Sequence, residues 1–440
     1  MAASLSAAPA PDPAALAARA ALDARDPVVL LTGRAGTGKS WFIRRLIEED
    51  QHRPQVVLAP TGLAAMNIGG QTVHSFFGFP PRPLLGFKEK PNWFFTQNAR
   101  RLSRIVIDEI SMLRADTLDA MDAHLRAAKK SAKPFGGVQM LLVGDFYQLP
   151  PVVRGDEGRL LEEAGYQSPY AFSALSLRDV GVSAFELTAM RRQTEAHFIA
   201  LLQAIRDRAG VRDAVAELND ACFDARPLPV RPVLLCATNA VADGYNARGL
   251  AALPGAAQVF EGGFKGALPK QGVSGDRLPA PLSLALKRGA RVIFTQNDPE
   301  GVWVNGTLGT VVSFDADAVR VAIDASELRD GAEVDVARSS WPQARWQWNE
   351  AAQAMETKEE YRYEQFPLSP AWAITIHKAQ GMTLDAVEVD LGRGAFAPGQ
   401  TYVALSRART LDGLRLTRPL QERDVQVDDA IAEGLARWVG

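Results

Sequence analysis

Short apolar runs alternate with longer amphipathic stretches along the first part of the chain. The runs rich in leucine and β-branched residues are 28–31, 56–58, 105–107 and 140–143. Runs of this length between stretches of helical periodicity predict a parallel sheet covered by helices. Ahead of them, the Ala-rich residues 13–25 predict a short helix that starts at a proline. Residues 1–12 are expected to form a flexible tail, so residues 1–26 precede the first domain.

The same alternation resumes near residue 186 and predicts a second α/β domain. Its expected elements are strands at 184–187, 233–237 and 387–389 and a helix at 195–207. Between His74 and Leu102, seven Phe and Trp residues stand among Pro, Gly and Lys, which predicts a small insertion. Val-rich alternation over 286–363, with an Asn305-Gly306 hairpin turn, predicts a β-barrel-like insertion.

These patterns divide the chain into two tandem α/β domains with one insertion each. The first domain is expected at 27–74 and 102–185, and its insertion at 75–101. The second domain is expected at 186–285 and 364–440, and its insertion at 286–363.

Composition narrows the classes of function. The 440 residues include 49 basic and 51 acidic side chains, for a net charge of −2. A strongly basic overall surface is therefore excluded, and any polyanion site must be a local groove. Cys222 and Cys236 have no close Cys or His partner, which excludes a disulfide framework and a zinc cluster. Without a long apolar run or a secretion-signal pattern, a cytoplasmic protein is expected.

A glycine-rich loop follows the first expected strand. The residues Gly33-Arg34-Ala35-Gly36-Thr37-Gly38-Lys39-Ser40 have the G-x-x-x-x-G-K-S spacing of a phosphate loop, and a helix is expected from Trp41 onward. Such a loop surrounds phosphate oxygens with backbone N–H groups, and the helix N-terminus adds a positive dipole. Lys39 is expected to contact the β- and γ-phosphates, and Ser40 to bind Mg²⁺. A nucleoside triphosphate with Mg²⁺ is therefore the predicted ligand.

Two acidic residues follow the strand at 105–107. The C-terminal end of a buried parallel strand is where open sheets of this kind bind ligands. Asp108 would hold Mg²⁺, and Glu109 would polarise the attacking water, a role that hydrolysis requires and binding does not. The alternative is that these acids cap the next helix.

Further segments, in order along the chain, resemble the Pif-type (petite integration frequency) helicases of superfamily 1B. The matching segments are Ala-Pro-Thr-Gly at 59–62, Thr-Val-His-Ser-Phe-Phe at 72–77, Asp-Glu-Ile-Ser-Met at 108–112, Pro-Phe-Gly-Gly-Val-Gln at 134–139, Gly-Asp-Phe-Tyr-Gln-Leu-Pro-Pro at 144–151, Arg-Gln at 192–193 with Ile-Arg at 205–206, Thr-Ile-His-Lys-Ala-Gln-Gly-Met-Thr-Leu at 375–384 and Tyr-Val-Ala-Leu-Ser-Arg at 402–407. The resemblance covers about residues 27 to 417, and the Pro-Phe-Gly-Gly stretch favours the Pif branch over the RecD-like branch. The family often carries an adenine-reading Gln upstream of the phosphate loop, but no Gln precedes Gln51, which leaves strict preference for ATP open.

This resemblance implies an α/β fold of two tandem RecA-like P-loop domains, with a wedge insertion (1B) and an SH3-like β-barrel insertion (2B). It implies a DNA helicase that uses ATP and Mg²⁺, moves 5′ to 3′ on single-stranded DNA, and unwinds duplex DNA, G-quadruplexes or RNA:DNA hybrids. The implied cellular roles are DNA replication, DNA repair and telomere maintenance. A monomeric, nucleoid-associated protein of bacterial type is expected.

On the nucleotide side, the resemblance implies four further residues. Arg192 and Arg407 would reach the γ-phosphate from the second domain and stabilise charge on the transferring group. Ordinary surface salt bridges are the alternative for both arginines. Gln148 and Gln380 would sense the γ-phosphate and couple hydrolysis to domain closure. Gln380 and the following Gly381 are also expected to bind the nucleotide.

On the DNA side, the resemblance implies a track across both domains. Its candidate residues are Pro60, Thr61, His74, Ser75 and Phe76 on the first domain and Thr238, Asn239, Thr375, His377 and Lys378 on the second. Hydroxyl groups and rings suit backbone contact and base stacking rather than sequence reading. Phe76 and His377 could instead be buried core residues. Trp93, Phe94 and Phe95 are expected to form the strand-separating wedge, or else to pin the insertion to its own domain.

Other functions stay open from the sequence. A RecD-like 5′ to 3′ helicase with another cellular role would share most of these motifs. A nucleotide-gated clamp would hold single-stranded DNA and hydrolyse ATP without separating strands. A P-loop kinase or GTPase is disfavoured because the chain has no N-K-x-D guanine motif and such enzymes need no second α/β domain.

Overall fold

The computed structural model describes residues 12–80, 82–86, 91–190, 192–193, 195–223, 228, 230–266, 278–324 and 332–439. The expected tail, except Asp12, lies outside these residues. The helix expected after it is confirmed as α1 (Pro13–Asp23), and the Asp12 carboxylate caps it by accepting the Ala14 N–H at 2.9 Å. None of the described helices is long and apolar enough to span a bilayer.

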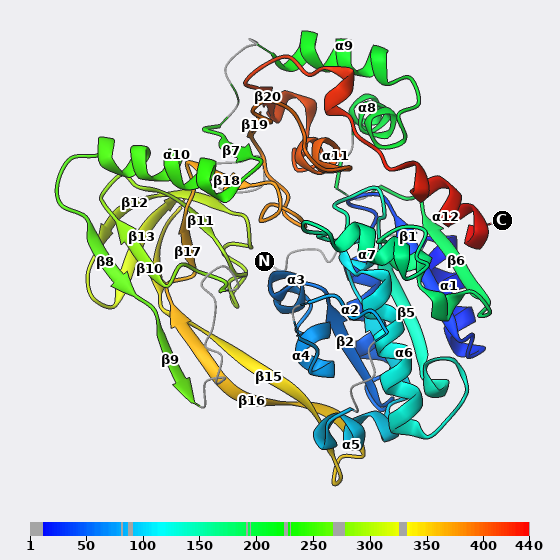
Figure 1. Ribbon diagram of the computed structural model, residues 1–440. Coiled ribbons are helices and arrows are strands. Elements are labelled where there is room, and N and C mark those ends of the chain that lie inside the picture. Colours follow the sequence, from blue (N-terminus) through cyan, green and yellow to red (C-terminus); the bar gives the residue numbers. More distant parts are fainter. Residues whose placement is uncertain are drawn as a thin grey trace, which may run out of the picture.

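The first domain is built on a six-stranded parallel sheet in the order β3-β2-β4-β5-β1-β6 (Figure 1). The strands are β1 (Val28–Gly33), β2 (Gln55–Ala59), β3 (Gln71–Thr72), β4 (Arg104–Ile107), β5 (Gln139–Gly144) and β6 (Val182–Leu187). Alternate residues enter opposite cores: Leu30 packs with α6 (Ala115–Lys129), and Leu31 packs with α1 and α2 (Lys39–Glu49). Burial on both faces explains why these strands are continuous apolar runs, and the four that were predicted are confirmed.

One predicted strand belongs to a different domain from the one expected. The run at 184–187 was assigned to the second domain, but β6 pairs in parallel with β1 and forms the edge of the first sheet. Periodicity identifies a strand without identifying its partner, so this assignment was wrong. The smaller helices of the first domain are α3 (Gly62–Asn67) and α7 (Glu157–Glu163), with single turns η1 (Ile110–Met112), η2 (Pro134–Gly137), η3 (Ala171–Ser173) and η4 (Leu175–Leu177).

The insertion expected at 75–101 is small and closely joined to the first domain. Its helices are α4 (Val73–Phe77) and α5 (Trp93–Arg101), and Asn92 caps α5 by accepting the Phe95 N–H at 2.8 Å. Phe77 and Phe95 lie in the core beneath the first sheet, with ring centroids 4.8 Å apart. Much of the aromatic content therefore serves the core of the first domain.

The second domain has a four-stranded parallel sheet in the order β18-β7-β19-β20. Its elements are α8 (Ala196–Asp207), α9 (Val211–Cys222), β7 (Val233–Cys236), α10 (Asn239–Ala252), β18 (Ala373–Thr375), β19 (Val387–Asp390), α11 (Gln400–Leu405), η6 (Leu411–Gly413), β20 (Leu414–Leu416) and η7 (Glu422–Asp424). The strands expected at 233–237 and 387–389 and the helix at 195–207 are confirmed.

The last described helix, α12 (Asp429–Val439), leaves the second domain and packs against the first (Figure 1). Ile431 is buried there, and the Trp438 ring meets Phe146 and Phe172 edge-on at centroid distances of 6.4 and 6.2 Å. Both α1 and α12 contact β6.

Antiparallel strands form a β module that is larger than the expected insertion at 286–363. Its main sheet has the order β14-β13-β12-β11-β17, and β8 pairs with β10. The strands are β8 (Gln258–Glu261), β10 (Ser283–Leu286), β11 (Arg291–Phe294), β12 (Leu308–Phe314), β13 (Ala318–Ile323), β14 (Glu333–Ala337) and β17 (Leu368–Pro370). The Asn305-Gly306 turn lies within the long 295–307 connection of β11 to β12, so it is not the tight hairpin turn that was expected.

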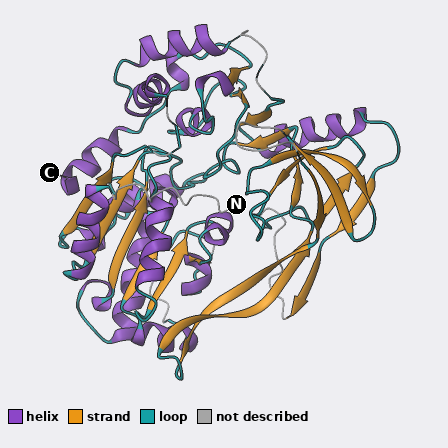
Figure 2. Cartoon of the chain, turned by 180° about the vertical axis from the view of Figure 1, so that it is seen from behind, coloured by secondary structure: helices purple, strands orange, loops and turns teal. Residues whose placement is uncertain are grey.

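A long ribbon joins this module to the first domain (Figures 1 and 2). It consists of β15 (Ser339–Asn349) and β16 (Ala354–Gln365), with β9 (Gly263–Gly266) along one edge. At its far end the Asn98 amide of α5 donates to the Trp346 carbonyl at 3.0 Å and accepts the Trp348 N–H at 2.9 Å. The ribbon therefore completes a ring of first domain, second domain and β module.

Candidate nucleotide site and DNA channel

A cavity of about 1740 Å³ lies where the two α/β domains and the β module meet. Its walls include the phosphate loop, the ends of β2 and β4, the 377–386 segment of the second domain and the 295–308 segment of the β module. Segments far apart in the sequence thus share one space, which can hold a nucleotide at one end and a polymer strand along the rest.

The phosphate loop has the strand-loop-helix form that its spacing predicts. It connects β1 to α2, and Gly36 and Gly38 adopt φ values of 83° and 96°, which favour glycine. The Lys39 ammonium donates to the Gly33 and Arg34 carbonyls at 2.6 and 2.9 Å, inside the loop. Burial lowers the pKa of Lys39, because it disfavours the protonated ammonium form. A bound phosphate group would stabilise that positively charged form. Ser40 and Trp41 line the same cavity.

Asp108 and Glu109 stand at the C-terminal end of β4, facing the phosphate loop. Burial, together with the Glu109 charge, raises the pKa of Asp108 to about 7, and burial raises the pKa of Glu109. Glu109 precedes η1 without a side-chain capping bond, so the capping alternative gains no support from it. Its φ of 52° is rare for a residue with a side chain, and such strain is typical of functional sites.

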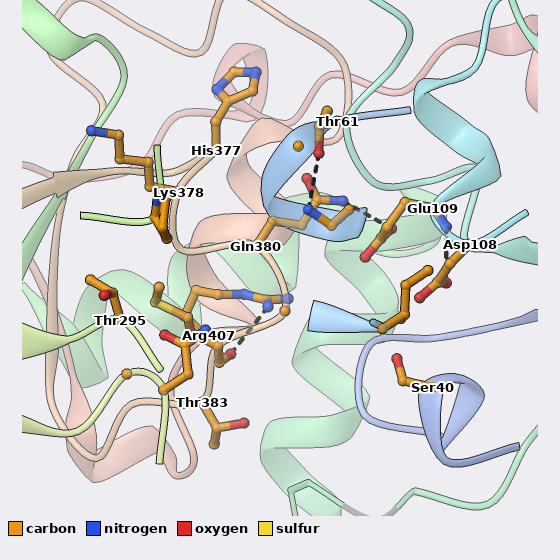
Figure 3. A pocket seen from close by; sticks show the side chains of 18 of the residues that line it. Ser40, Thr61, Asp108, Glu109, Thr295, His377, Lys378, Gln380, Thr383 and Arg407 are labelled. Carbon is orange, nitrogen blue, oxygen red and sulfur yellow. Dashed lines mark hydrogen bonds between the residues drawn. The ribbon is translucent and has the colours of Figure 1, made fainter. Parts of the chain in front are cut away.

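The two predicted sensor amides contact each other, and one of them also contacts Glu109. The Gln380 amide donates to Glu109 Oε2 at 3.1 Å and to Gln148 Oε1 at 3.4 Å. Figure 3 shows the Gln380 side chain directed toward Glu109, with Asp108 beside it. Since Gln380 belongs to the second domain and the other residues to the first, this contact spans the cleft.

Arg192 and Arg407 face the same cleft from the second-domain side. Arg407 is 1% exposed and donates to the carbonyls of Val403 at 2.9 Å and Met382 at 3.2 Å. Burial, with Arg192 nearby, lowers the pKa of Arg407 to about 9. Arg192 donates to the Gly381 carbonyl at 3.2 Å, while its Nη1 is buried without a partner.

Neither arginine has a carboxylate among its hydrogen-bond partners in the described chain, so the salt-bridge alternative gains no support. A Cβ added to Gly36 would lie 2.4 Å from the Arg192 Cβ and clash with it. The absence of a side chain at Gly36 therefore allows Arg192 to pack against the phosphate loop. Two cations without acidic partners at a phosphate loop are suited to an anionic ligand.

The sequence reasoning missed three residues that join the domains at this site. The Tyr402 hydroxyl accepts the Ala35 N–H of the phosphate loop at 3.1 Å. Arg206 of α8 forms a buried ion pair with Asp145 at 3.2 Å. All three stand inside the matched segments, but spacing alone does not show which partners they contact across the cleft.

Six of the ten nucleic-acid candidates line the cavity. They are Pro60, Thr61, His74, Ser75, His377 and Lys378. Burial lowers the pKa of His377, which favours its neutral form. Apart from Pro60, these residues carry hydroxyls, imidazoles and an ammonium, as expected for a track that grips a backbone.

The other four candidates lie elsewhere. Phe76 is 6% exposed in the core of the first domain, so its ring cannot stack on a base here, and this prediction was wrong. Thr375 is buried, and its hydroxyl accepts the Lys378 N–H at 3.2 Å, so it holds the backbone of Lys378 in place. Thr238 caps α10 and, like Asn239, is exposed outside the cavity.

The three wedge candidates have different environments. Phe95 is 1% exposed and belongs to the core, so its assignment to the wedge was wrong. The Arg345 guanidinium of the ribbon lies 4.8 Å from the Phe94 ring centroid. Trp93 is 75% exposed and is the one of the three whose ring is free to meet a fork.

Comparisons with known proteins agree with this geometry. A family model described as PIF1-like helicase matches residues 15–214. The ATP-dependent DNA helicase Pif1 of Bdellovibrio bacteriovorus is 34% identical over 398 residues, which cover 88% of this chain and 83% of the relative. The ATP-dependent DNA helicase PIF1 of Danio rerio is 34% identical over 402 residues, again 88% of this chain, and the match spans 58% of that longer relative.

Solved structures give the same result. The crystal structure of Bacteroides sp. Pif1 in complex with ADP-AlF4 has a TM-score of 0.86 at 32% identity, covering 97% of this chain and 96% of that one. The crystal structure of Bacteroides Pif1 bound to single-stranded DNA has a TM-score of 0.69 at 32% identity over the same shares.

Two parallel α/β domains that face each other across a phosphate loop define a P-loop protein of the tandem RecA-like type. Within that class, the chain belongs to the PIF1-like helicase family. The RecD-like alternative is thereby set aside.

Proposed function

We propose that the chain is an ATP-dependent DNA helicase that translocates 5′ to 3′ along single-stranded DNA and unwinds duplex DNA. The observation that carries this proposal is the placing of Arg192 and Arg407, without carboxylate partners, opposite the phosphate loop of the other domain. A catalytic site split between two domains makes hydrolysis depend on their approach, and this links chemistry to movement. The names of the relatives and the single-stranded DNA complex of the Bacteroides protein support the same activity.

The residues present fit a nucleotide with Mg²⁺. Ser40 and Asp108 offer one hydroxyl and one carboxylate at the phosphate loop, the sparse protein ligand set that Mg²⁺ takes alongside phosphates and waters. The raised pKa of Asp108 reflects a buried carboxyl beside another acid, and a divalent cation would compensate both charges. Bound there, Mg²⁺ would neutralise charge on the phosphates.

Each side chain then has a distinct task. Lys39 holds the phosphates, and Glu109 Oε2 accepts the proton of the attacking water, a role favoured by its raised pKa. Arg192 and Arg407 stabilise charge on the transferring phosphoryl group. Gln148 and Gln380 report the presence of that group, because both amides already contact each other across the cleft.

The finer proposals follow the relatives' chemistry. We expect a 5′ tail to be required for loading, and G-quadruplexes and RNA:DNA hybrids to be further substrates in replication, repair and telomere maintenance. We propose a monomer in the cytoplasm, associated with the nucleoid. One solved Pif1 structure concerns unwinding of forked duplex DNA by two coordinating Pif1 helicases, so two molecules at one fork are compatible with a monomeric solution state.

A strand-displacement experiment tests the proposal. The protein is given ATP with 5′-tailed, 3′-tailed and quadruplex substrates, and ATP hydrolysis is measured alongside. Unwinding of the 5′-tailed duplex and not of the 3′-tailed one is expected. Hydrolysis stimulated by single strands without displacement of any substrate would instead identify a nucleotide-gated clamp.

A further inference from the structure

Gln193 follows Arg192 in the connection between β6 and α8, which is also the first covalent link between the two α/β domains. Its side chain is 1% exposed and does not belong to the lining of the cavity, so it does not touch a ligand bound there. What this buried amide can do is therefore decided by its contacts within the protein.

The Gln193 amide holds the backbone on both sides of Arg407. Its Nε2 donates to the carbonyls of Ser406 and Ala408, each at 3.1 Å. The helix α11 ends at Leu405, and the last carbonyls of a helix have no partner within it. Gln193 therefore supplies the donors that the end of α11 lacks, and it does so at the two residues that flank Arg407.

The same backbone is held from the other side by Leu384. The Leu384 N–H donates to the Arg407 carbonyl at 3.0 Å, and the Arg409 N–H donates to the Leu384 carbonyl at 3.1 Å. Residues 406–408 thus lie between Leu384 and Gln193. Removal of the Gln193 amide would release one side of this segment and leave two buried carbonyls without a donor.

The orientation of the amide follows from these bonds, because only its NH₂ group can donate to two carbonyls. Gln193 Oε1 is buried and has no hydrogen-bond partner in the described part of the chain. It lies toward the phosphate loop, since a Cβ added to Gly36 would be 3.4 Å from Gln193 Oε1 and 2.4 Å from the Arg192 Cβ. Arg192 and Gln193 therefore pack side by side against that loop.

Asp12 holds the start of the same connection to the first domain. Its Oδ2 accepts the N–H groups of Thr188 and Ala189, each at 3.1 Å, while its Oδ1 caps α1. Three positions, 190–192, separate Ala189 from Gln193. A change in the angle between the domains must be taken up within this short stretch. The Gln193 contacts thus decide whether Arg192 follows the second domain.

We propose that Gln193 is a positioning residue for hydrolysis, which holds Arg192 and Arg407 as one rigid pair so that both reach the transferring phosphoryl group together. This inference rests on the proposed function. Gln193 acts only through the two arginines. Without its amide each arginine would approach the phosphoryl group separately, and a misplacement of about 1 Å can cost about 100-fold in rate.

The test begins with Gln193→Met, which removes the amide at nearly constant volume. With saturating oligo-dT, kcat for ATP hydrolysis should fall about 100-fold. KM for ATP and the equilibrium affinity for a fluorescent ATP analogue should stay within about threefold of wild type, because Gln193 acts on the transition state alone.

Asn219→Leu is the matched control. The Asn219 amide also bridges backbone groups in the second domain: it donates to the Leu420 carbonyl at 2.9 Å and accepts the Leu420 N–H at 2.7 Å. Neither residue lines the cavity. This variant should lose stability toward chemical unfolding, as Gln193→Met does, and keep wild-type kcat.

A double variant shows whether Gln193 acts through the arginines. Once Arg407→Ala has removed one member of the pair, the amide has little left to position. Adding Gln193→Met should therefore lower turnover by no more than about threefold beyond Arg407→Ala alone.

Each outcome decides the question. Wild-type kcat in Gln193→Met overturns the positioning role, and so does a parallel loss of nucleotide affinity or an equal loss of kcat in Asn219→Leu. A further 100-fold loss in the double variant also overturns it. A wild-type protein without hydrolysis stimulated by oligo-dT overturns the proposed function instead. If Gln193→Met does not fold, Gln193→Asn, whose amide is one methylene shorter, replaces it with an expected loss of about tenfold in kcat.

Discussion

The two ends of the central cavity are built on different principles. At the nucleotide end, Asp108 and Arg407 are buried and Lys39 and Glu109 are partly buried, and the pKa values of all four are shifted by loss of hydration and by neighbouring charges. At the DNA end, residues such as Ser75 and Lys378 are exposed, and Thr295 and Gln296 of the connection between β11 and β12 keep unpaired neutral groups. At the nucleotide end, poorly hydrated charges interact unfavourably, and binding of a small anionic ligand would relieve these interactions. The DNA end offers many weak contacts that can be made and broken as a strand moves.

This difference determines how each end responds to mutation. Removal of one charge at the nucleotide end leaves other buried charges uncompensated, so large and non-additive effects are expected. Removal of one contact at the DNA end leaves the others in place, so small and separable effects are expected.

The largest effect should come from the arginines. Arg192→Ala and Arg407→Ala should each lower ATP turnover by about 10³- to 10⁵-fold and leave affinity for single strands within a few fold. Arg320→Ala, which breaks an exposed ion pair with Asp335 in the β module, is the control and should keep wild-type turnover. Steady-state hydrolysis with saturating oligo-dT measures all three. Near wild-type turnover in Arg407→Ala would remove Arg407 from the catalytic set.

The next effect concerns the water. Glu109→Gln should lower turnover by about 10²- to 10⁴-fold while nucleotide still binds, because the amide cannot accept a proton. Equilibrium binding of a fluorescent ATP analogue, measured beside hydrolysis, separates the two quantities. Glu300→Gln, at an exposed position in the connection between β11 and β12, removes the same charge and serves as the control. Loss of nucleotide binding in Glu109→Gln would show that Glu109 is needed for binding as well as for chemistry.

The wedge provides a test at the DNA end. Phe95→Ala should destabilise the protein by about 3 to 5 kcal/mol because the ring is buried in the core. Trp93→Ala should leave stability unchanged and reduce unwinding of a 5′-tailed duplex while translocation persists. Chemical unfolding and strand displacement, measured on both variants, tell the roles apart. Full unwinding by Trp93→Ala would move the wedge to another part of the ring.

The smallest effect depends on pH. The folded pKa of Asp108 is about 7, above its ordinary 3.8, so the stabilisation that its neutral form gives is present below about pH 4 and lost as the pH rises through 7. Asp108→Asn imitates the neutral form at every pH. Without nucleotide, the variant should melt with wild type near pH 4 and a few degrees higher near pH 8. A melting difference that is the same at both pH values would contradict this account.

Sequence reasoning succeeded where local spacing carries the information. The phosphate loop, the acids after β4 and five of the six strands of the first sheet were found because each depends on neighbours in the chain. It failed where a residue's role depends on distant partners. Phe76, Phe95 and Trp93 stand in the same aromatic-rich stretch of the sequence. Only the three-dimensional packing shows that the two phenylalanines are buried and the tryptophan is exposed. The same is true of β6, whose strand was expected but whose partner, β1, lies about 150 residues away.

The return of α12 to the first domain has a mechanical consequence. The second domain is joined to the first by two covalent connections, after β6 and before α12. A rigid body attached at two points rotates about the line through them. We therefore expect the cleft to open by rotation of the second domain about the line through its two connections. The β module, at the far end from that axis, would travel along the widest arc once the ribbon gives up the contacts of Trp346 and Trp348 with Asn98 of the first domain. Probes on α1 and α12 should then keep a constant separation through the ATP cycle, and a probe pair on α1 and β13 should register the full swing.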